Sequence, residues 1–187
     1  MSRYVASFLG RDCPGVVAVV AHLLQERQCS IVEFSQTILT GEFAAIVIVD
    51  APDSLSAERL AAEMRAGLAA AQVDLSTTVR PTTGESWATG RNCQPFVVSA
   101  DGPDRVGQIA GMSGVFARHG VNIENVKAIL GEGGPGQALF VFEVMVPDAV
   151  EITQLRQELK AKGEQLGLRV SVQHRDIFEA VHRVLPV

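Results

Sequence analysis

The sequence predicts an α+β protein of 187 residues in which the element order βαββαβ occurs twice. The first observation behind this prediction is an internal repeat. A shift of 92 positions aligns residues 5–31 with residues 97–123 at seven identities and without a gap, where composition alone gives about two. The second observation is the hydrophobic period, which changes between strand and helix values in the same order in both copies.

Each element of the first copy follows from its pattern of apolar residues. Alternation or β-branched residues indicate strands, and apolar stripes at helical spacing indicate helices, such as Leu60, Met64 and Leu68. Pro14 suits the first helical position, where its missing N–H costs nothing. We expect strand, helix, strand, strand, helix and strand over residues 4–9, 14–27, 30–39, 43–50, 56–71 and 73–80.

The second copy repeats this order. We expect the same six elements over residues 96–101, 106–119, 122–130, 138–146, 152–166 and 169–174. The stretch between the copies, TTGESWATGRNCQ, is rich in glycine and small polar residues and indicates a linker. The expected domains are therefore residues 1–81 and 95–187, with a linker over residues 82–94.

The order βαββαβ is that of the ferredoxin-like fold, in which both helices cover one face of an antiparallel sheet. The opposite face of each sheet then needs a cover, and the linker, the C-terminal tail and a partner are all candidates. The tail is amphipathic, and we expect it to pack on a sheet face or on a partner through Ile177, Phe178, Val181 and Leu185.

Composition limits the classes of function. A net charge of −5 argues against a nucleic-acid surface, which needs clustered basic residues. Three cysteines without a CxxC pair fit a reducing compartment, and they indicate neither a disulfide framework nor a zinc site. The sequence shows no signal peptide and no apolar run of membrane-spanning length, so we expect a cytoplasmic protein without cofactor, metal or membrane partner.

The most informative motif is a turn that both copies place between the first strand and the first helix, GRDCPG at 10–15 and GPDRVG at 102–107. We expect the first glycine of each turn to adopt positive φ and the last to let another group come close. Free N–H groups at a helix N-terminus attract a carboxylate, and the neighbouring aspartate attracts an ammonium group. The turn therefore suits a zwitterion, and a simple capped turn is the alternative.

These turns, with the helix and strand that follow them, resemble the ACT domain, a small-molecule-sensing regulatory module. The second copy, GPDRVGQIAGMSGVFARHGVNIENV, matches the family pattern more closely than the first. Two copies without an attached enzyme resemble the glycine cleavage system transcriptional repressor family. The resemblance implies that an amino acid binds between the turn of one domain and the second strand of a neighbour. Carried over to this sequence, the site residues are Asp12, Pro14, Gly15, Asp104, Val106, Gly107, Asn122, Ile123 and Asn125.

The two copies differ where this second strand begins. Ser30 and Glu33 of the first copy stand where the second has Asn122 and Asn125. Asparagine can donate to a carboxylate and accept from an amine, whereas serine is shorter and glutamate repels a carboxylate. We therefore expect the ligand at the second copy's strand, with the first copy's turn as a candidate contributor.

The resulting hypothesis is a non-catalytic regulatory protein that binds a small amino acid, glycine being one candidate. It would modulate a protein partner in transcriptional or metabolic regulation and form a homodimer through its exposed sheet edges. The alternative is an interaction or dimerisation module that binds no ligand. A small enzyme using Cys13 or the region of His174 is a third hypothesis, although the sequence shows no nucleophile–base set.

Overall fold

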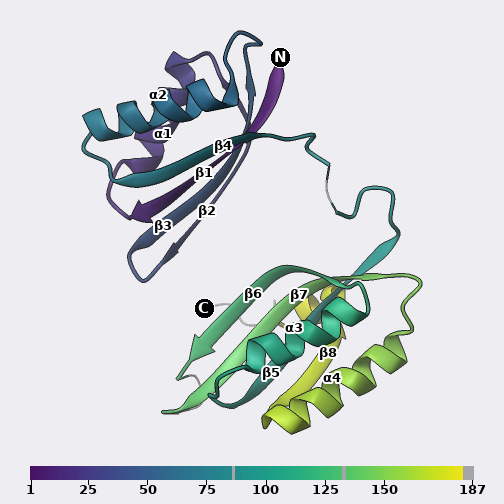
Figure 1. Cartoon of the computed structure of the whole chain (residues 1–187). Coiled ribbons are helices and arrows are strands. Elements are labelled where there is room, and N and C mark those ends of the chain that lie inside the picture. The colour runs from purple at the N-terminus through teal and green to yellow at the C-terminus, as the bar shows by residue number, and fades with distance from the viewer. Residues whose placement is uncertain (86, 132–133, 183–187) are drawn as a thin grey trace. The chain divides into compact units, whose positions relative to one another are not determined.

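The computed structural model describes residues 1–85, 87–131 and 134–182, with side chains as far as Phe178. The chain divides into two compact units, Met1–Glu85 and Ser86–Val187 (Figure 1). No helix within the described residues is long and apolar enough to cross a lipid bilayer.

The first unit is a four-stranded antiparallel sheet with two helices packed on one face (Figure 1). Its strands lie in the order β2-β3-β1-β4, so β2 and β4 form the edges. The elements are β1 (Ser2–Arg11), α1 (Val16–Glu26), β2 (Ser30–Leu39), β3 (Glu42–Ala51), α2 (Ala57–Ala70) and β4 (Leu75–Pro81).

The second unit repeats this architecture, with the strand order β6-β7-β5-β8 and an additional C-terminal helix. Its elements are β5 (Cys93–Pro103), α3 (Gln108–Arg118), β6 (Asn122–Leu130), β7 (Gln137–Pro147), α4 (Ile152–Leu166), β8 (Arg169–His174) and α5 (Arg175–His182). The predicted fold class, two ferredoxin-like βαββαβ units with antiparallel sheets, is confirmed.

Four elements, β2, β6, α4 and β8, have the bounds that the sequence predicts. The prediction is wrong at the start of α1 and α3, which both begin two residues later than expected. Gly15 and Gly107 are their N-caps and adopt the left-handed conformation, so the preceding residues belong to the turn. Pro14 therefore lies in the turn and not at the first helical position.

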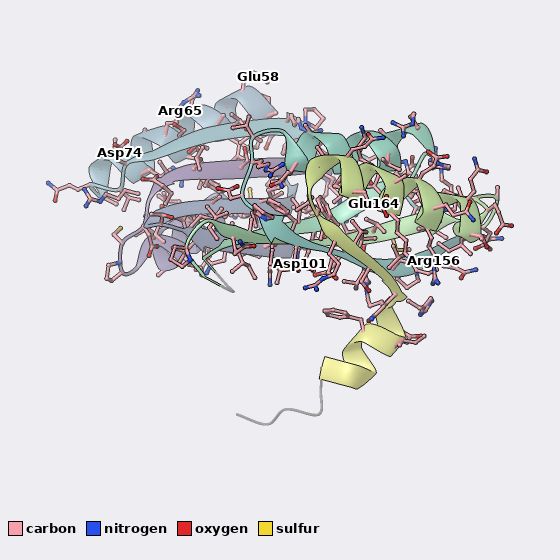
Figure 2. All side chains as sticks on the ribbon, turned by 90° about the horizontal axis from the view of Figure 1, so that it is seen from below. Glu58, Arg65, Asp74, Asp101, Arg156 and Glu164 are labelled. Carbon is pink, nitrogen blue, oxygen red and sulfur yellow. The ribbon has the colours of Figure 1, made fainter. Side chains whose placement is uncertain are left out.

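Each unit has its own core between the sheet and its two helices. Phe8 of β1 is fully buried in the first core, and Phe116 and Phe142 meet in the second with their ring centroids 5.4 Å apart. Charged side chains such as Glu58 and Arg65 of α2 lie on the outer surface (Figure 2). The alternation that predicted the strands thus directs one face of each sheet into the helix–sheet core.

The two sheets differ on the face that turns away from the helices, here called the open face. In the second unit α5 packs against β5 and β8, and Val97 on the open face is 4% exposed. The equivalent Val5 of the first unit is only half-buried, and Leu9 and Ile46 on the same face are each 57% exposed. The C-terminal tail therefore covers part of the second sheet, and the first unit has no corresponding helix among its described residues.

The apolar residues expected to pack this tail against a surface differ in their exposure. Phe178 is half-buried, whereas Ile177 is 59% exposed. The side chains of Val181 and Leu185 lie outside the described residues. The polar residue Arg175 supplies the contact that sequence reasoning did not foresee, through Glu124 of β6 at 2.6 Å.

Candidate functional site

The last glycine of each turn is required by backbone conformation. Gly15 and Gly107 have φ of 90° and 91°, a region that glycine enters without the penalty other residues pay. A Cβ at either position would meet nothing within 4 Å. Within each unit no described protein group approaches these glycines closely, so it is the left-handed bend that requires them.

The first glycine of each turn is required because a neighbouring backbone segment leaves no room for a Cβ. A Cβ on Gly10 would lie 2.2 Å from the carbonyl oxygen of Asp74, and one on Gly102 would lie 2.4 Å from that of Gly167. Neither of these first glycines has positive φ. The expectation of positive φ at the first glycine is therefore wrong, because the last glycine of each turn adopts it.

The backbone N–H of the aspartate in each turn is hydrogen-bonded to the hairpin between the next two strands. The N–H of Asp12 donates to the carbonyl of Gly41, and that of Asp104 to the carbonyl of Gly136, both at 2.9 Å. Neither helix N-terminus receives a side-chain cap. Among the described residues neither aspartate carboxylate has a hydrogen-bond partner, so the capping alternative is wrong.

The helix starts beside these aspartates keep their positive potential. Neither α1 nor α3 has an acidic residue in its first turn, so no side chain there offsets the helix dipole. Val106 is fully exposed and Pro14 is exposed as well. The second unit offers one more donor here, because proline lacks the N–H that Val106 has.

The strand side of the expected site begins at a β-bulge. The register shifts between Ile123 and Asn125 in the second unit, as it does at the equivalent point of the first. Asn122 and Ile123 are half-buried, and Ile123 packs against the core. The Nδ2 group of Asn125 donates to Glu143 Oε1 at 3.1 Å, which leaves the amide oxygen without a partner among the described residues.

The sheet register places the turn and the strand opening at opposite ends of each unit. In the second unit Gly102 pairs with Ala138, whereas Asn122 pairs with Met145, which in turn pairs with Pro95. The seven residue-to-residue steps from Pro95 to Gly102 span about 23 Å of strand. The first unit has the same arrangement, so neither unit can bring its own turn and strand opening to one ligand.

One residue next to the turn was missed by sequence reasoning. Gln108, the first residue of α3, is 1% exposed, and its side chain bonds to backbone groups within the turn and at the end of α4. The signal was present in the internal repeat, because Gln108 aligns with the buried Val16. A polar residue at a buried apolar position of a repeat indicates a specific hydrogen-bond requirement.

The side chains considered for catalysis or metal binding make packing contacts within their own units. Cys13 is half-buried and packs against the first core, and the ring of His174 meets Phe96 edge-on at 5.3 Å. Within residues 1–85, 87–131 and 134–182, no three His, Cys, Asp or Glu residues come together as a metal site. The side chain of His182 lies outside the described residues.

Family models match both units. The ACT domain model matches residues 2–79, and a second ACT domain model matches residues 96–164. A UPF0237 protein of Methanopyrus kandleri is 40% identical to this chain over 92 residues, and one of Pyrobaculum aerophilum is 40% identical over 88 residues. Each alignment covers 47% of this chain and 96% of the relative, which is about one unit.

Solved structures with the same fold cover nearly the whole chain. An unknown protein from Galdieria sulphuraria superposes with a TM-score of 0.75 at 20% identity, over 92% of this chain and 98% of that one. A protein provisionally assigned as a glycine cleavage system transcriptional repressor gives 0.67 at 19% identity, over 92% and 96%. Together with the matches of both units, these comparisons show that the chain belongs to the ACT-domain family and carries two ACT domains in tandem.

Proposed function

We propose that this chain is a non-catalytic regulatory protein of the cytoplasm that binds a small amino acid, glycine among the candidates, and modulates a protein partner. Its two ACT domains support a ligand-binding regulatory role. The likeness to a protein provisionally assigned as a transcriptional repressor supports transcriptional or metabolic regulation as the setting. The acidic composition supports action through a protein rather than on nucleic acid.

The observation that carries this proposal is the duplicated turn, in which an aspartate without a side-chain partner among the described residues lies beside an uncapped helix N-terminus. The helix N–H groups suit the α-carboxylate of an amino acid. The carboxylate of Asp12 or Asp104 suits its ammonium group. A short turn that offers both charges at once selects a zwitterion over a simple anion.

The complete site in this proposal joins two ACT domains. One domain provides a turn, and the other provides the strand opening of β6 through Asn122, Ile123 and Asn125. Because Asn125 donates its amide hydrogen to Glu143, its oxygen is the group that can accept from an ammonium. Self-association is part of the proposal, since β2 and β6 are edge strands with unpaired backbone groups.

The test begins with thermal-shift measurements of the full chain against the twenty proteinogenic amino acids. A ligand at 100 times its Kd raises the free energy of unfolding by about 2.7 kcal/mol. Calorimetric titration of Asp104→Ala and Asn122→Ala should then show at least tenfold weaker binding. Glu164→Ala removes an exposed carboxylate on the outer face of α4 (Figure 2) and is the matched control. Wild-type affinity in both site variants would reject the site.

The alternative, an interaction module without ligand, is favoured by the open face of the first unit. A shallow hollow of about 360 Å³ lies there, and its lining includes the exposed Leu9 and Ile46 but none of the predicted site residues. Apolar surface of this kind marks contact sites in many proteins. A folded dimer that responds to none of the twenty amino acids would support this alternative over ligand binding.

A further inference from the structure

Gln108 is a buried polar residue that holds together three separate backbone groups. Its Oε1 accepts the N–H of Arg105 at 3.0 Å, and its Nε2 donates to the carbonyls of Pro103 at 2.8 Å and Leu166 at 3.2 Å. Its side chain is 1% exposed. A buried amide with its donors and acceptor satisfied resists rearrangement, because any movement leaves polar groups unpaired in a poorly solvated place.

These bonds fasten the turn of the second unit at both of its ends. Pro103 is the last residue of β5 and Arg105 precedes the N-cap Gly107, so Gln108 fixes the turn from within. Leu166, the last residue of α4, precedes Gly167, whose carbonyl lies against Gly102. The turn is therefore attached to the end of α4 by a hydrogen bond as well as by backbone packing.

The first unit lacks this attachment. Val16 occupies the equivalent position and is buried, but its side chain can form no hydrogen bond. The residue before the N-cap also differs, because Pro14 has no N–H whereas Val106 does. The two turns thus share backbone shape at their glycines, but only the second has the hydrogen bonds of Gln108 and the N–H group of Val106.

We propose that Gln108 is a positioning residue that holds the turn of the second unit ready for a ligand carboxylate, and that this turn is the tighter-binding of the two. The inference rests on the proposed function and refines it, because it selects the second unit's turn over the first. Gln108 acts through the backbone of residues 103–107. The exposed N–H groups of Val106 and Gly107 would touch the ligand.

The test compares wild type with Gln108→Val, which copies the first unit, and with Gln108→Met, which keeps the side-chain length without its polar atoms. Thr77→Val is the matched control, because Thr77 is the other buried polar residue of the described chain and lies in the first unit. Hydrogen exchange of individual amides is measured without ligand, and binding of the twenty amino acids is measured by calorimetry.

We expect the Arg105 amide to exchange at least tenfold faster in both Gln108 variants, while the amides of β7 keep their wild-type protection. Amino-acid binding should weaken about tenfold in the same variants and remain unchanged in Thr77→Val. If the Gln108→Val chain fails to fold, Gln108→Met provides the test, because the methionine side chain is closer in volume to glutamine than valine is.

Two results would overturn the inference. Unchanged Arg105 exchange would show that Gln108 does not hold the turn. Faster Arg105 exchange with unchanged affinity would show that the held turn does not contribute to binding. If wild type binds none of the amino acids, the proposed function fails, and with it the ligand role of the turn; the exchange data then decide separately whether Gln108 organises the backbone.

Discussion

Replacing Gly102 by alanine tests the close backbone approach at the start of the second unit's turn. The added Cβ would lie 2.4 Å from the carbonyl oxygen of Gly167. An ordinary contact needs about 3.4 Å, so the two chain segments must separate by roughly 1 Å. The obstacle is backbone, and Leu168 beside it is tied to Gly163 by a 2.8 Å hydrogen bond, so the strain cannot be relieved by a side-chain rotation.

Forced separations of this kind cost about 1–3 kcal/mol. For a unit of about 100 residues, a cost near 2 kcal/mol lowers Tm by roughly 8–16 °C. The assay is scanning calorimetry of the full chain. Gly114→Ala provides the matched control, because a Cβ at this helical glycine meets nothing within 4 Å, and alanine should stabilise α3 by about 0.5–1 kcal/mol.

We expect changes in stability of opposite sign for these two glycine-to-alanine substitutions, which lie twelve positions apart in the same unit. A Gly102→Ala chain whose Tm equals or exceeds that of wild type would refute the argument from close approach. A loss of stability in Gly114→Ala similar to that of Gly102→Ala would show that the unit responds to any added methyl group. Only the predicted pair of signs supports the geometric explanation.

Two further predictions concern titratable groups. The pKa of Glu158 is lowered, chiefly by its hydrogen bond with His119, so the ionised carboxylate stabilises the folded state. This stabilisation is fully present above the ordinary carboxyl pKa and is lost as the pH falls through the lowered value. Urea unfolding between pH 6 and pH 3 should therefore show a smaller loss of stability in Glu158→Gln than in wild type, and equal losses would contradict the assignment. Burial raises the pKa of the Cys29 thiol, so at pH 8 a thiol reagent should modify the half-buried Cys13 and Cys93 first, and equally fast labelling of all three would count against burial as the controlling factor.

The fold was predictable because the same pattern occurs twice. Helix α4 and strands β2, β6 and β8 have the predicted bounds, since long periodic segments determine their own class. The start of α1 was misjudged because Pro14 was placed at the first helical position, and the start of α3 was placed at Val106 to match it. Each helix begins only after its left-handed glycine, Gly15 or Gly107. A backbone conformation that depends on a single glycine cannot be read from hydrophobic periodicity.

The candidate site was less predictable than the fold. The sequence predicted the turns and the strand that begins at Asn122. The close approach of Gly102 to Gly167 joins segments 65 positions apart and leaves no local pattern. The contact between Asn125 and Glu143 also depends on strand pairing. Gln108 was recoverable in principle, because the repeat placed it opposite Val16, but only the structure shows which backbone groups it binds.

The separation of turn and strand opening within each unit determines whether the affinity of the proposed site depends on protein concentration. If a site is completed by domains of two chains, the amino acid binds only the associated state, so ligand and association stabilise each other by mass action. The apparent affinity measured by titration then falls as the protein is diluted, and the ligand shifts the monomer–dimer balance by an equal free energy. A site completed within one chain would instead give an affinity that dilution leaves unchanged, so a titration at two protein concentrations distinguishes these arrangements.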